Sequence, residues 1–424
     1  MKNVIKLFFI FTLVFWSCSS EPTEDLDDTG VVPVPDPITV VPPLVTIPSS
    51  GLTPCENGRA GIFPCLGYNL QALVTLETMQ ASSGNDSWGW TDIQTGKEYA
   101  IMGVNDGTVF VDISIPDQPI YLGKLPTATV ESTWRDIKVY QNHAFIVSEA
   151  INHGLQVFDL TRLRDITREE TFTADATLNS FGNAHNIAIN ESSGFAYVIG
   201  STLYQGGPAF IDINDPLNPI LVGGFSDESY SHDAHIITYD GPDTEHRGKE
   251  ILFGSNSDGG ENNQVIIVDV TDKSAPTLLS NVTYNNGGYT HQGWMAEDHQ
   301  YYYLGDELDE TRFGGRSKTL VFDLQDLDNP VLHHTYLGVT NAIDHNGYTK
   351  NNSFFLANYT AGFREIDTQN IANGVMEEVG FFDTFPENNG ANFNGVWSVY
   401  PYFESKVIVV SDSNRGLFLV KATE

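Results

Sequence analysis

The segment Gly107-Thr-Val-Phe-Val-Asp112 decides the fold, because the same β-rich run ending in aspartate recurs along the chain. A last run, Gly416 to Lys421, matches except for its final residue. The five runs between them are Gly154 to Asp159, Gly207 to Asp212, Gln264 to Asp269, Lys318 to Asp323 and Gly362 to Asp367. Four of the six aspartates are followed seven positions later by a proline, at Pro119, Pro219, Pro276 and Pro330, which indicates one turn design used repeatedly.

The spacing of these runs predicts the architecture. Successive aspartates lie 47, 53, 57, 54 and 44 residues apart, which leaves room for four short strands and their turns in each unit. No unit contains a convincing amphipathic helix. Seven such units predict an all-β, seven-bladed β-propeller, whereas the alternative, a β-helix, normally has shorter repeats.

The two ends of the repeat region are predicted to meet. In the first blade the expected strands are 90–93, 98–104, 108–113 and 120–125, but the last blade runs out of chain after its third strand. The β-rich segment Leu70 to Met79 precedes the first blade and has no hairpin partner of its own. We therefore expect it to supply the missing outer strand and close the ring, which also protects the edge strands.

The first residues are expected to be an export signal. Residues 1–17 carry Lys2 and Lys6 and then an apolar run, Leu7 to Trp16, that is too short to span a bilayer. The run stops at Ser17-Cys18-Ser19-Ser20, which resembles the lipobox of bacterial lipoproteins. Lipidation of Cys18 would make the lipid the sole contact with the membrane; ordinary cleavage or a free thiol is the alternative.

Residues 18–54 read as an acidic, Pro-rich tether, because this composition cannot bury a core. Glu21, Glu24 and Asp25 resemble the surface-export signal of lipoproteins in one group of Gram-negative bacteria. The expected location is therefore the outer membrane, with the body exposed at the cell surface; a merely soluble linker is the alternative.

Charge excludes one class of partner. The chain has 21 Lys and Arg against 55 Asp and Glu, for a formal net charge of −34. A nucleic-acid binder needs a basic face to displace counterions from phosphates, so no nucleic-acid partner is expected.

The expected partner is an extracellular ligand or protein, and the body, residues 55–424, is expected to be a monomer.

Cys55 and Cys65 form an even pair in a chain expected to be exported. Because that compartment is oxidising, we expect a disulfide between them. Two buried thiols, or less readily a metal site, are the alternatives.

Several motifs lie between and around the repeated runs. They include Trp88-Gly-Trp-Thr-Asp92, Ala184-His-Asn-Ile187, His291-Gln-Gly-Trp294, Asp344-His-Asn346 and Asn358-Tyr-Thr-Ala-Gly362. With them, residues 55 to 424 resemble the choice-of-anchor B family of surface proteins built from LVIVD repeats. The resemblance implies an exported, propeller-like body that different organisms tether by different anchors. It brings no established reaction or ligand.

A polar pair occupies the expected start of every blade. The pairs are Thr91-Asp92, Arg135-Asp136, His185-Asn186, His232-Asp233, His291-Gln292, His345-Asn346 and Asn394-Gly395. Since the innermost strand of a blade begins at one rim of the channel, the pairs should converge there. The ends of the second strands should add a second ring, with Asn105, Glu149, Ser201, Asn256, Asp306, Glu307, Tyr359 and Asp412.

Together the two rings predict a funnel that binds a ligand. The predicted binding residues are Arg135, Asp136, Asn186, Asp233, Gln292, Asp306, Asp344, Asn346 and Asn394. The alternative is structural: polar side chains at blade starts often form hydrogen bonds with neighbouring blades.

The funnel histidines also suggest a metal. His185, His232, His291 and His345 would hold a divalent transition metal as neutral imidazoles, with Asp136, Asp233 or Asp344 orienting a ring. His235 is expected to lie outside this ring, because residues three apart in a strand face opposite sides. Calcium is a second option at Asp306, Glu307, Asp309 and Glu310, although the sequence favours a solvated acidic loop there.

The sequence contains no Gly-x-Ser-x-Gly elbow and no phosphate-binding loop. For the tryptophans at blade starts, core packing is favoured over sugar stacking. The function expected is binding of a ligand or partner through the funnel. The alternatives are a metal-dependent hydrolase or oxidoreductase, in which Arg135 would hold an anionic substrate, and a scaffold for other surface proteins.

Overall fold

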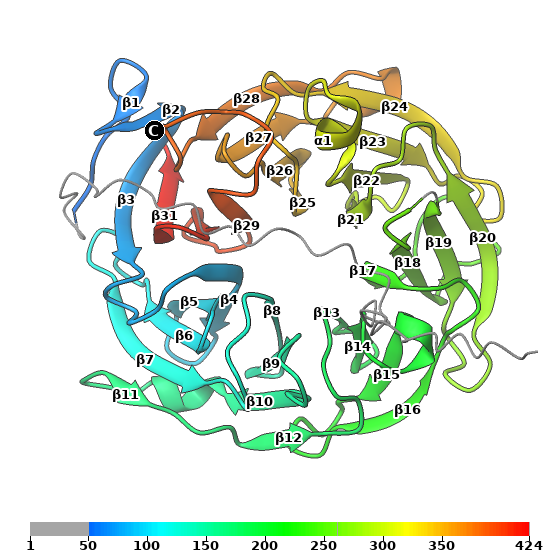
Figure 1. Ribbon diagram of the computed structural model, residues 1–424, viewed down its shortest axis with the longest axis horizontal. Helices are drawn as coiled ribbons and strands as arrows, with labels where there is room; N and C mark the ends of the chain where they lie inside the picture. The colour runs from blue at the N-terminus through cyan, green and yellow to red at the C-terminus, as the bar shows by residue number, and fades with distance from the viewer. Residues whose placement is uncertain (1–50, 261, 424) are drawn as a thin grey trace, which may run out of the picture.

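The computed structural model describes residues 51–260 and 262–423, in which seven β-sheets are arranged in a ring (Figure 1). The predicted all-β, seven-bladed propeller is confirmed. The predicted signal peptide, the lipidation site Cys18 and most of the tether lie outside the described residues. Within the described part of the chain, no helix is long and apolar enough to cross a membrane.

Each blade is an antiparallel sheet whose first strand lies innermost. Blade one consists of β4 (Gly84–Asp92), β5 (Lys97–Val104), β6 (Gly107–Asp112) and β7 (Ile120–Pro126), and blade two of β8 (Arg135–Tyr140), β9 (His143–Ser148), β10 (Leu155–Asp159) and β12 (Ala176–Leu178). Blade three consists of β13 (Asn186–Asn190), β14 (Phe195–Ile199), β15 (Ala209–Asp212) and β16 (Ile220–Gly224). Blade four consists of β17 (Ser231–Thr238), β18 (Glu250–Ser257), β19 (Asn263–Asp269) and β20 (Thr277–Thr283).

The remaining blades follow the same order. Blade five consists of β21 (Thr290–Met295), β22 (Tyr301–Asp306), β23 (Lys318–Asp323) and β24 (Val331–Leu337). Blade six consists of β25 (Gly347–Lys350), β26 (Ser353–Ala357), β27 (Phe363–Asp367) and β28 (Glu377–Phe382), and blade seven of β29 (Val396–Tyr400), β30 (Val407–Asp412), β31 (Gly416–Ala422) and β3 (Tyr68–Thr75). A short parallel strand, β11 (Glu170–Thr171), extends blade one beyond β7.

The repeated run is the third strand of every blade, and its aspartate has a local function. In six blades the Oδ1 atom of that aspartate accepts a hydrogen bond of 2.8 to 3.0 Å from the backbone N–H two residues later. This bond holds the turn that leads away from the strand. The recurrence of aspartate is thus explained by turn geometry, and it marks no catalytic site.

The core lies between neighbouring blades, because both faces of each sheet are covered. Phe110 of β6 stacks on Phe158 of β10, with ring centroids 4.6 Å apart, and both side chains are fully buried. The third strands can therefore be apolar on both faces, which explains why they read as continuous hydrophobic runs.

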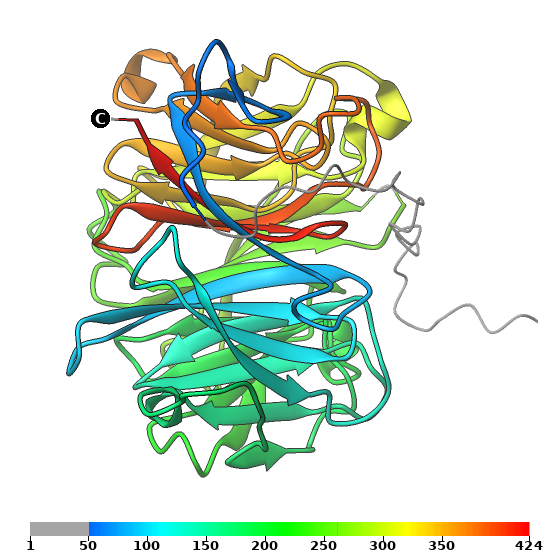
Figure 2. The same cartoon turned by 90° about the vertical axis from the view of Figure 1, so that its left-hand side faces the viewer.

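The predicted closure is also confirmed. The strand β3 pairs with β31 in antiparallel register from Tyr68↔Ala422 to Thr75↔Gly416, so the first long strand completes the last blade (Figure 2). The strand covers Tyr68–Thr75 and not the expected 70–79, because the chain turns after Thr75, whose carbonyl accepts a hydrogen bond from the N–H of Met79.

The hairpin of β1 (Arg59–Ala60) and β2 (Phe63–Leu66) was not predicted from the sequence. It extends blade six, where Cys65 and Leu66 of β2 pair with Phe382 and Phe381 of β28. The predicted disulfide between Cys55 and Cys65 is confirmed, with their Cα atoms 6.1 Å apart. The disulfide therefore links the segment before this hairpin to β2, the strand that extends blade six.

Candidate functional site

The seven inner strands surround the centre of the ring (Figure 1), and residues at or just before their starts line one small cavity. The residues that line a small cavity there are Asn85, Asp86, Trp134, Arg135, Asp136, His185, Asn186, His232, His291, His345, Asn346 and Trp397. We call this set the funnel ring. Its cavity measures about 20 Å³, enough for one water molecule or one metal ion.

Two of the seven predicted blade-start pairs are in the wrong register. In blade one, Asn85 and Asp86 are left out of the pairing between β4 and β5, and Asp86 Oδ1 accepts a hydrogen bond from the next residue's N–H, as Asp136 and Asp233 do. Thr91 and Asp92 lie at the far end of β4, where Asp92 pairs with Arg164. The strand is longer than the sequence pattern suggested.

Blade seven shows the second error. The pairing of β29 with β30 skips Trp397, in the way that blades four and five skip His232 and His291. Trp397 is therefore the counterpart of the histidines. Asn394 precedes the strand, shares hydrogen bonds with Asn392 and Asn414, and is absent from the lining of the funnel-ring cavity.

The four predicted histidines lie side by side. The ring centroids of His185 and His232 are 4.1 Å apart, those of His232 and His291 4.3 Å, and those of His291 and His345 4.2 Å. Burial lowers the pKa values of His232, His291 and His345, to about 3 for His345, so these rings are neutral at physiological pH. The predicted convergence of the four imidazoles is confirmed, whereas metal binding stays a prediction.

Backbone contacts set the tautomers of two of these rings. His232 Nδ1 donates to the carbonyl of His291 at 3.0 Å, and His345 Nδ1 donates to the carbonyl of Trp397 at 2.5 Å. Because a carbonyl only accepts, Nδ1 carries the proton and Nε2 keeps its lone pair. This is the form of histidine that binds a metal ion.

Two glutamates of the predicted second ring contact the histidines. Glu149 accepts a hydrogen bond from His185 Nδ1 at 2.5 Å; burial opposes protonation, but this contact outweighs it and raises the pKa of His185. Glu307 lies with its carboxylate oxygens 3.8 Å from His291 Nε2 and 3.7 Å from His345 Nε2, and burial raises the pKa of Glu307 to about 7. His291, Glu307 and His345 could therefore hold one metal ion.

Arg135 is a fully buried member of the funnel ring, with an exposed fraction of 1%. Its Nη1 donates to His153 Nε2 at 2.9 Å, and its Nη2 has no hydrogen-bond partner. Burial lowers the pKa of Arg135 to about 10, so the guanidinium remains charged at neutral pH. Arg135 belongs to the same cavity lining as the four histidines.

Three charged side chains, those of Asp86, Asp136 and Lys138, lie close together on the inner strands of blades one and two. Lys138 Nζ contacts Asp136 Oδ1 at 2.6 Å, and Asp136 Oδ2 accepts a hydrogen bond from the N–H of Ile187 in the next blade. Burial and the charge of Asp136 raise the pKa of Asp86 to about 8. Both oxygens of Asp136 thus take part in structural contacts, one of them with the neighbouring blade. This agrees with the alternative that polar side chains at blade starts form hydrogen bonds between blades.

The other predicted binding residues lie in different places. Asp306 is buried and accepts hydrogen bonds from Tyr284, Gly288 and Tyr289, which is a structural role. Gln292 accepts from the N–H of Gly347 in the neighbouring blade. Asp344 joins Asp309 and Glu310 in a separate buried cluster.

The expectation of a solvated acidic loop is wrong, because Asp309 and Glu310 are each only 5% exposed. The charge run in the sequence resembled a surface loop, but the fold packs it against the neighbouring blade.

A larger cavity lies further along the inner strands and was not predicted. It measures about 430 Å³, and its lining includes Trp88, Trp294, Tyr348, Tyr400, Tyr402 and His235. His235 stacks on Trp294 with ring centroids 3.9 Å apart, and Lys138 Nζ lies 4.7 Å from the centre of the Trp88 ring. Asp233 and Gln292, two of the predicted binding residues, also line this cavity. We call it the aromatic cavity.

A signal for the aromatic cavity was present in the sequence. Three aromatic residues on inner strands follow a polar residue by two positions: Trp88 follows Asp86, Trp294 follows Gln292 and Tyr348 follows Asn346. Side chains two apart in a strand share a face. His235 follows Asp233 in the same way, so the prediction that it lies outside the histidine ring is confirmed, but it still lines the channel side of its strand.

Comparison with known proteins supports the repeat and the fold. A model of the LVIVD repeat matches residues 259–284, which include β19 and β20. No curated protein matches the chain in sequence. A crystal structure of a protein from Lactobacillus plantarum shares 14% identity at a TM-score of 0.53, over 75% of this chain and 91% of that one.

Kuenenia stuttgartiensis hydrazine synthase shares 13% identity at a TM-score of 0.53, over 77% of this chain and 92% of that one. At such identities the likeness concerns the fold alone, because propellers of one shape serve many functions. The function must be argued from the channel.

Proposed function

We propose that the protein is a lipid-anchored binding protein of the choice-of-anchor B type, displayed at the cell surface, which takes a small organic ligand in its aromatic cavity. The anchor and the location rest on the lipobox-like Cys18 and the acidic residues behind it. Radiolabelled palmitate should enter the wild-type chain and not Cys18→Ser; equal labelling would contradict the anchor.

The sizes of the two cavities support the aromatic cavity as the ligand site. The funnel ring surrounds about 20 Å³, which excludes an organic molecule, whereas the aromatic cavity has about 430 Å³. Ligand sites usually fall between about 300 and 1,000 Å³ and combine apolar walls with a few polar groups. We therefore propose the aromatic cavity as the ligand site, in place of the funnel that the sequence suggested.

The lining suggests the chemistry of the ligand. Five tryptophan and tyrosine side chains provide flat apolar surfaces, while His235, Gln292 and Glu297 bring hydrogen-bonding groups to the same cavity. A saccharide fits this combination, because its ring has apolar C–H faces and a rim of hydroxyl groups. The single observation that carries the proposal is the gathering of these aromatic rings around one open cavity.

The test is saccharide binding by the purified full chain, screened on a glycan array and measured by calorimetry. Trp294→Ala should weaken binding at least about 10-fold, since it removes one wall of the cavity. Phe313→Ala is the matched control, because Phe313 is 56% exposed and lies outside the cavity lining. No saccharide bound by the wild type, or equal binding by Trp294→Ala, would contradict the proposal.

A second function is favoured by the contacts of Glu307. Its carboxylate faces Nε2 of both His291 and His345, so a transition metal held there would form a metal-dependent enzyme, a hydrolase or an oxidoreductase, with Arg135 near a small anionic substrate. Elemental analysis should find metal in the wild type and little in a His291→Ala, His345→Ala double variant. His334→Ala, on β24, is the control. A wild-type protein that contains no metal would contradict the metal-dependent enzyme.

A further inference from the structure

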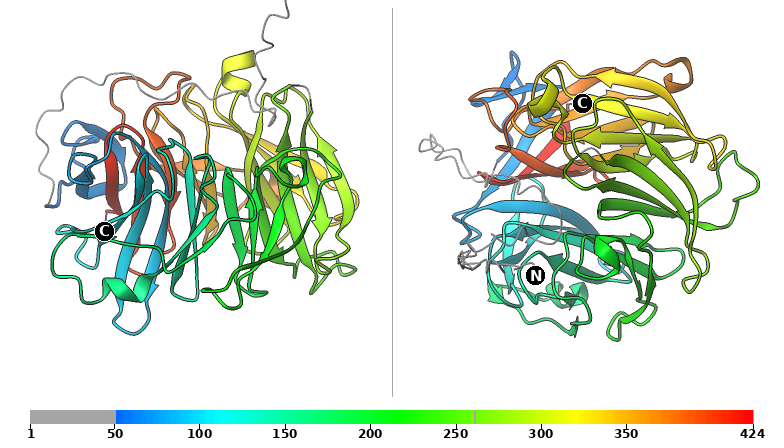
Figure 3. Two further views of the ribbon diagram at one scale, coloured as in Figure 1. Left: turned by 60° about the horizontal axis from the view of Figure 1, so that its bottom comes forward. Right: turned by 45° about the vertical axis from the view of Figure 1, so that its right-hand side comes forward.

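A second cluster of buried acids lies beside the funnel ring, at the junction of blades five and six. Asp309 and Glu310 belong to the short helix α1 (Asp309–Phe313) between β22 and β23, seen in yellow in Figure 3. Asp344 belongs to the connection between β24 and β25. One carboxylate oxygen from each of the three residues lies within 4.8 Å of the others.

Five of the six oxygens of these carboxylates lack a hydrogen-bond partner. Asp344 is 1% exposed, and neither of its oxygens has a hydrogen bond. Both oxygens of Glu310 and Oδ1 of Asp309 are equally buried and unpartnered. A carboxylate out of water needs compensation by a donor or a cation, so five such oxygens facing one small region point to a ligand that supplies positive charge.

One lysine compensates only part of this charge. Lys318 Nζ forms an ion pair with Oδ2 of Asp309, which leaves Glu310 and Asp344 without a cation. Three carboxylates against one ammonium leave two negative charges if all are ionised. A divalent cation would neutralise them.

We propose that Asp309, Glu310 and Asp344 bind a hard divalent cation, Ca²⁺, that joins blade five to blade six. The donors are all carboxylate oxygens, which favour Ca²⁺ over the transition metals expected at the histidines. Calcium–oxygen distances of about 2.3–2.6 Å allow ligands on opposite sides of the ion to lie almost 5 Å apart, which matches the spread of this cluster. Backbone carbonyls or water would complete the coordination.

The cation would also support the funnel ring. Glu307 lies two residues before Asp309, and His345 follows Asp344 directly, so the same two connections hold both clusters. Binding of Ca²⁺ should therefore order the segments that place Glu307 and His345. The calcium site does not depend on the saccharide or transition-metal proposals, because it shares no side chain with either.

The alternative is that the acids are protonated. Without a cation, burial and the nearby carboxylates of Asp344 and Asp309 raise the pKa of Glu310 to about 12, and the pKa of Asp344 also rises well above its usual range. A proton on each acid would then remove the charge with no metal. Added Ca²⁺ distinguishes the two possibilities, because only a cluster that binds the cation is stabilised by it.

The test uses the full chain stripped with a chelator, to which Ca²⁺ is added during calorimetry and thermal melting. We expect one Ca²⁺ bound per chain and an increase of several degrees in Tm. Glu310→Gln and Asp344→Asn should each weaken Ca²⁺ binding at least about 10-fold, because each removes a charged ligand. Both variants keep the shape of the side chain, so their metal-free Tm should equal or exceed that of metal-free wild type.

Asp328→Asn is the matched control, because Asp328 lies in a different cluster, with Asp243 and His246, and is exposed. It should keep the full response to Ca²⁺, as should the His291→Ala, His345→Ala variant. A wild type that binds no Ca²⁺, a response that survives in Glu310→Gln and Asp344→Asn, or tighter binding of Zn²⁺ at the same three residues would overturn the proposal.

Discussion

Replacing Leu70 and Leu73 together by aspartate is expected to abolish the folded ring. Both side chains are at most 2% exposed in β3, where they pack into the core between blades six and seven. Two buried carboxylates without partners should cost more than about 5 kcal/mol in total, which is a large part of the stability of a domain. Without β3, blade seven would also present β31 as an open edge strand.

Thermal unfolding followed by circular dichroism measures this effect. The double variant should show no cooperative transition, whereas Leu66→Asp should unfold within about 2 °C of the wild type, because Leu66 is 51% exposed on β2. A normal transition in the double variant would mean that the ring does not depend on closure by β3.

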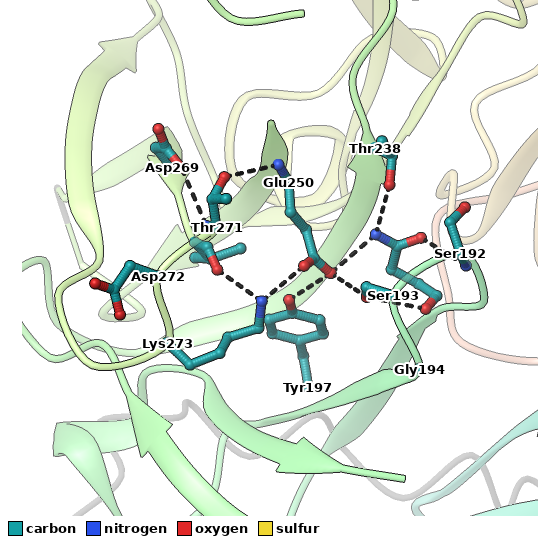
Figure 4. A network of polar contacts seen from close by, with 12 residues as sticks. Ser192, Ser193, Gly194, Tyr197, Thr238, Glu250, Asp269, Thr271, Asp272 and Lys273 are labelled. Carbon is teal, nitrogen blue, oxygen red and sulfur yellow. Dashed lines mark hydrogen bonds and ion pairs between the residues drawn. The ribbon is translucent and has the colours of Figure 1, made fainter. Parts of the chain in front are cut away.

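Glu250→Ala is expected to lower the free energy of unfolding by about 3–5 kcal/mol, the usual cost of breaking a buried ion pair by removing one partner. Figure 4 shows Tyr197, Ser193 and Lys273 converging on the Glu250 carboxylate. Tyr197 and Ser193 donate to Oε1 at 2.7 and 2.6 Å, and Lys273 Nζ contacts Oε2 at 2.7 Å. The network joins blade three to blade four.

Urea unfolding of single and double variants separates the contributions. Glu250→Ala leaves the ammonium of Lys273 without its carboxylate, so the double variant Glu250→Ala, Lys273→Ala should be less destabilised than the sum of its single variants. Glu250→Gln keeps oxygen as an acceptor and should cost less than Glu250→Ala. Strict additivity would show that the ion pair contributes little to the junction between these blades.

The repeat was predictable because local chemistry repeats with it. Six of the seven third strands combine an apolar run, suited to burial on both faces, with an aspartate that accepts a hydrogen bond from the N–H two residues later. Neither feature depends on distant parts of the chain. Closure of the ring was predictable from the number of strands in each unit. The last unit lacked its fourth strand, and the β-rich segment around Leu70 lacked a strand to pair with. The cysteine pair followed from the expected export.

The funnel ring was predictable only in part. Five blades were aligned correctly, but the register failed in blades one and seven, where Asp86 and Trp397 take the places assigned to Asp92 and Asn394. A residue skipped in the pairing changes which side chains face the channel, and no local preference reveals it. The aromatic cavity was missed because the tryptophans at blade starts were interpreted as core-packing residues, although their spacing of two from polar residues places them on the same face of the strand.

The amino-acid sequence by itself thus determined the number of blades, the closing strand and the convergence of four histidines, because turn chemistry and strand periodicity act over a few residues. Only the tertiary structure decided the depth and size of the channel, the burial of Asp309 and Glu310, and their meeting with Asp344. Those properties depend on how neighbouring blades pack, which brings together residues more than thirty positions apart and removes water from between them.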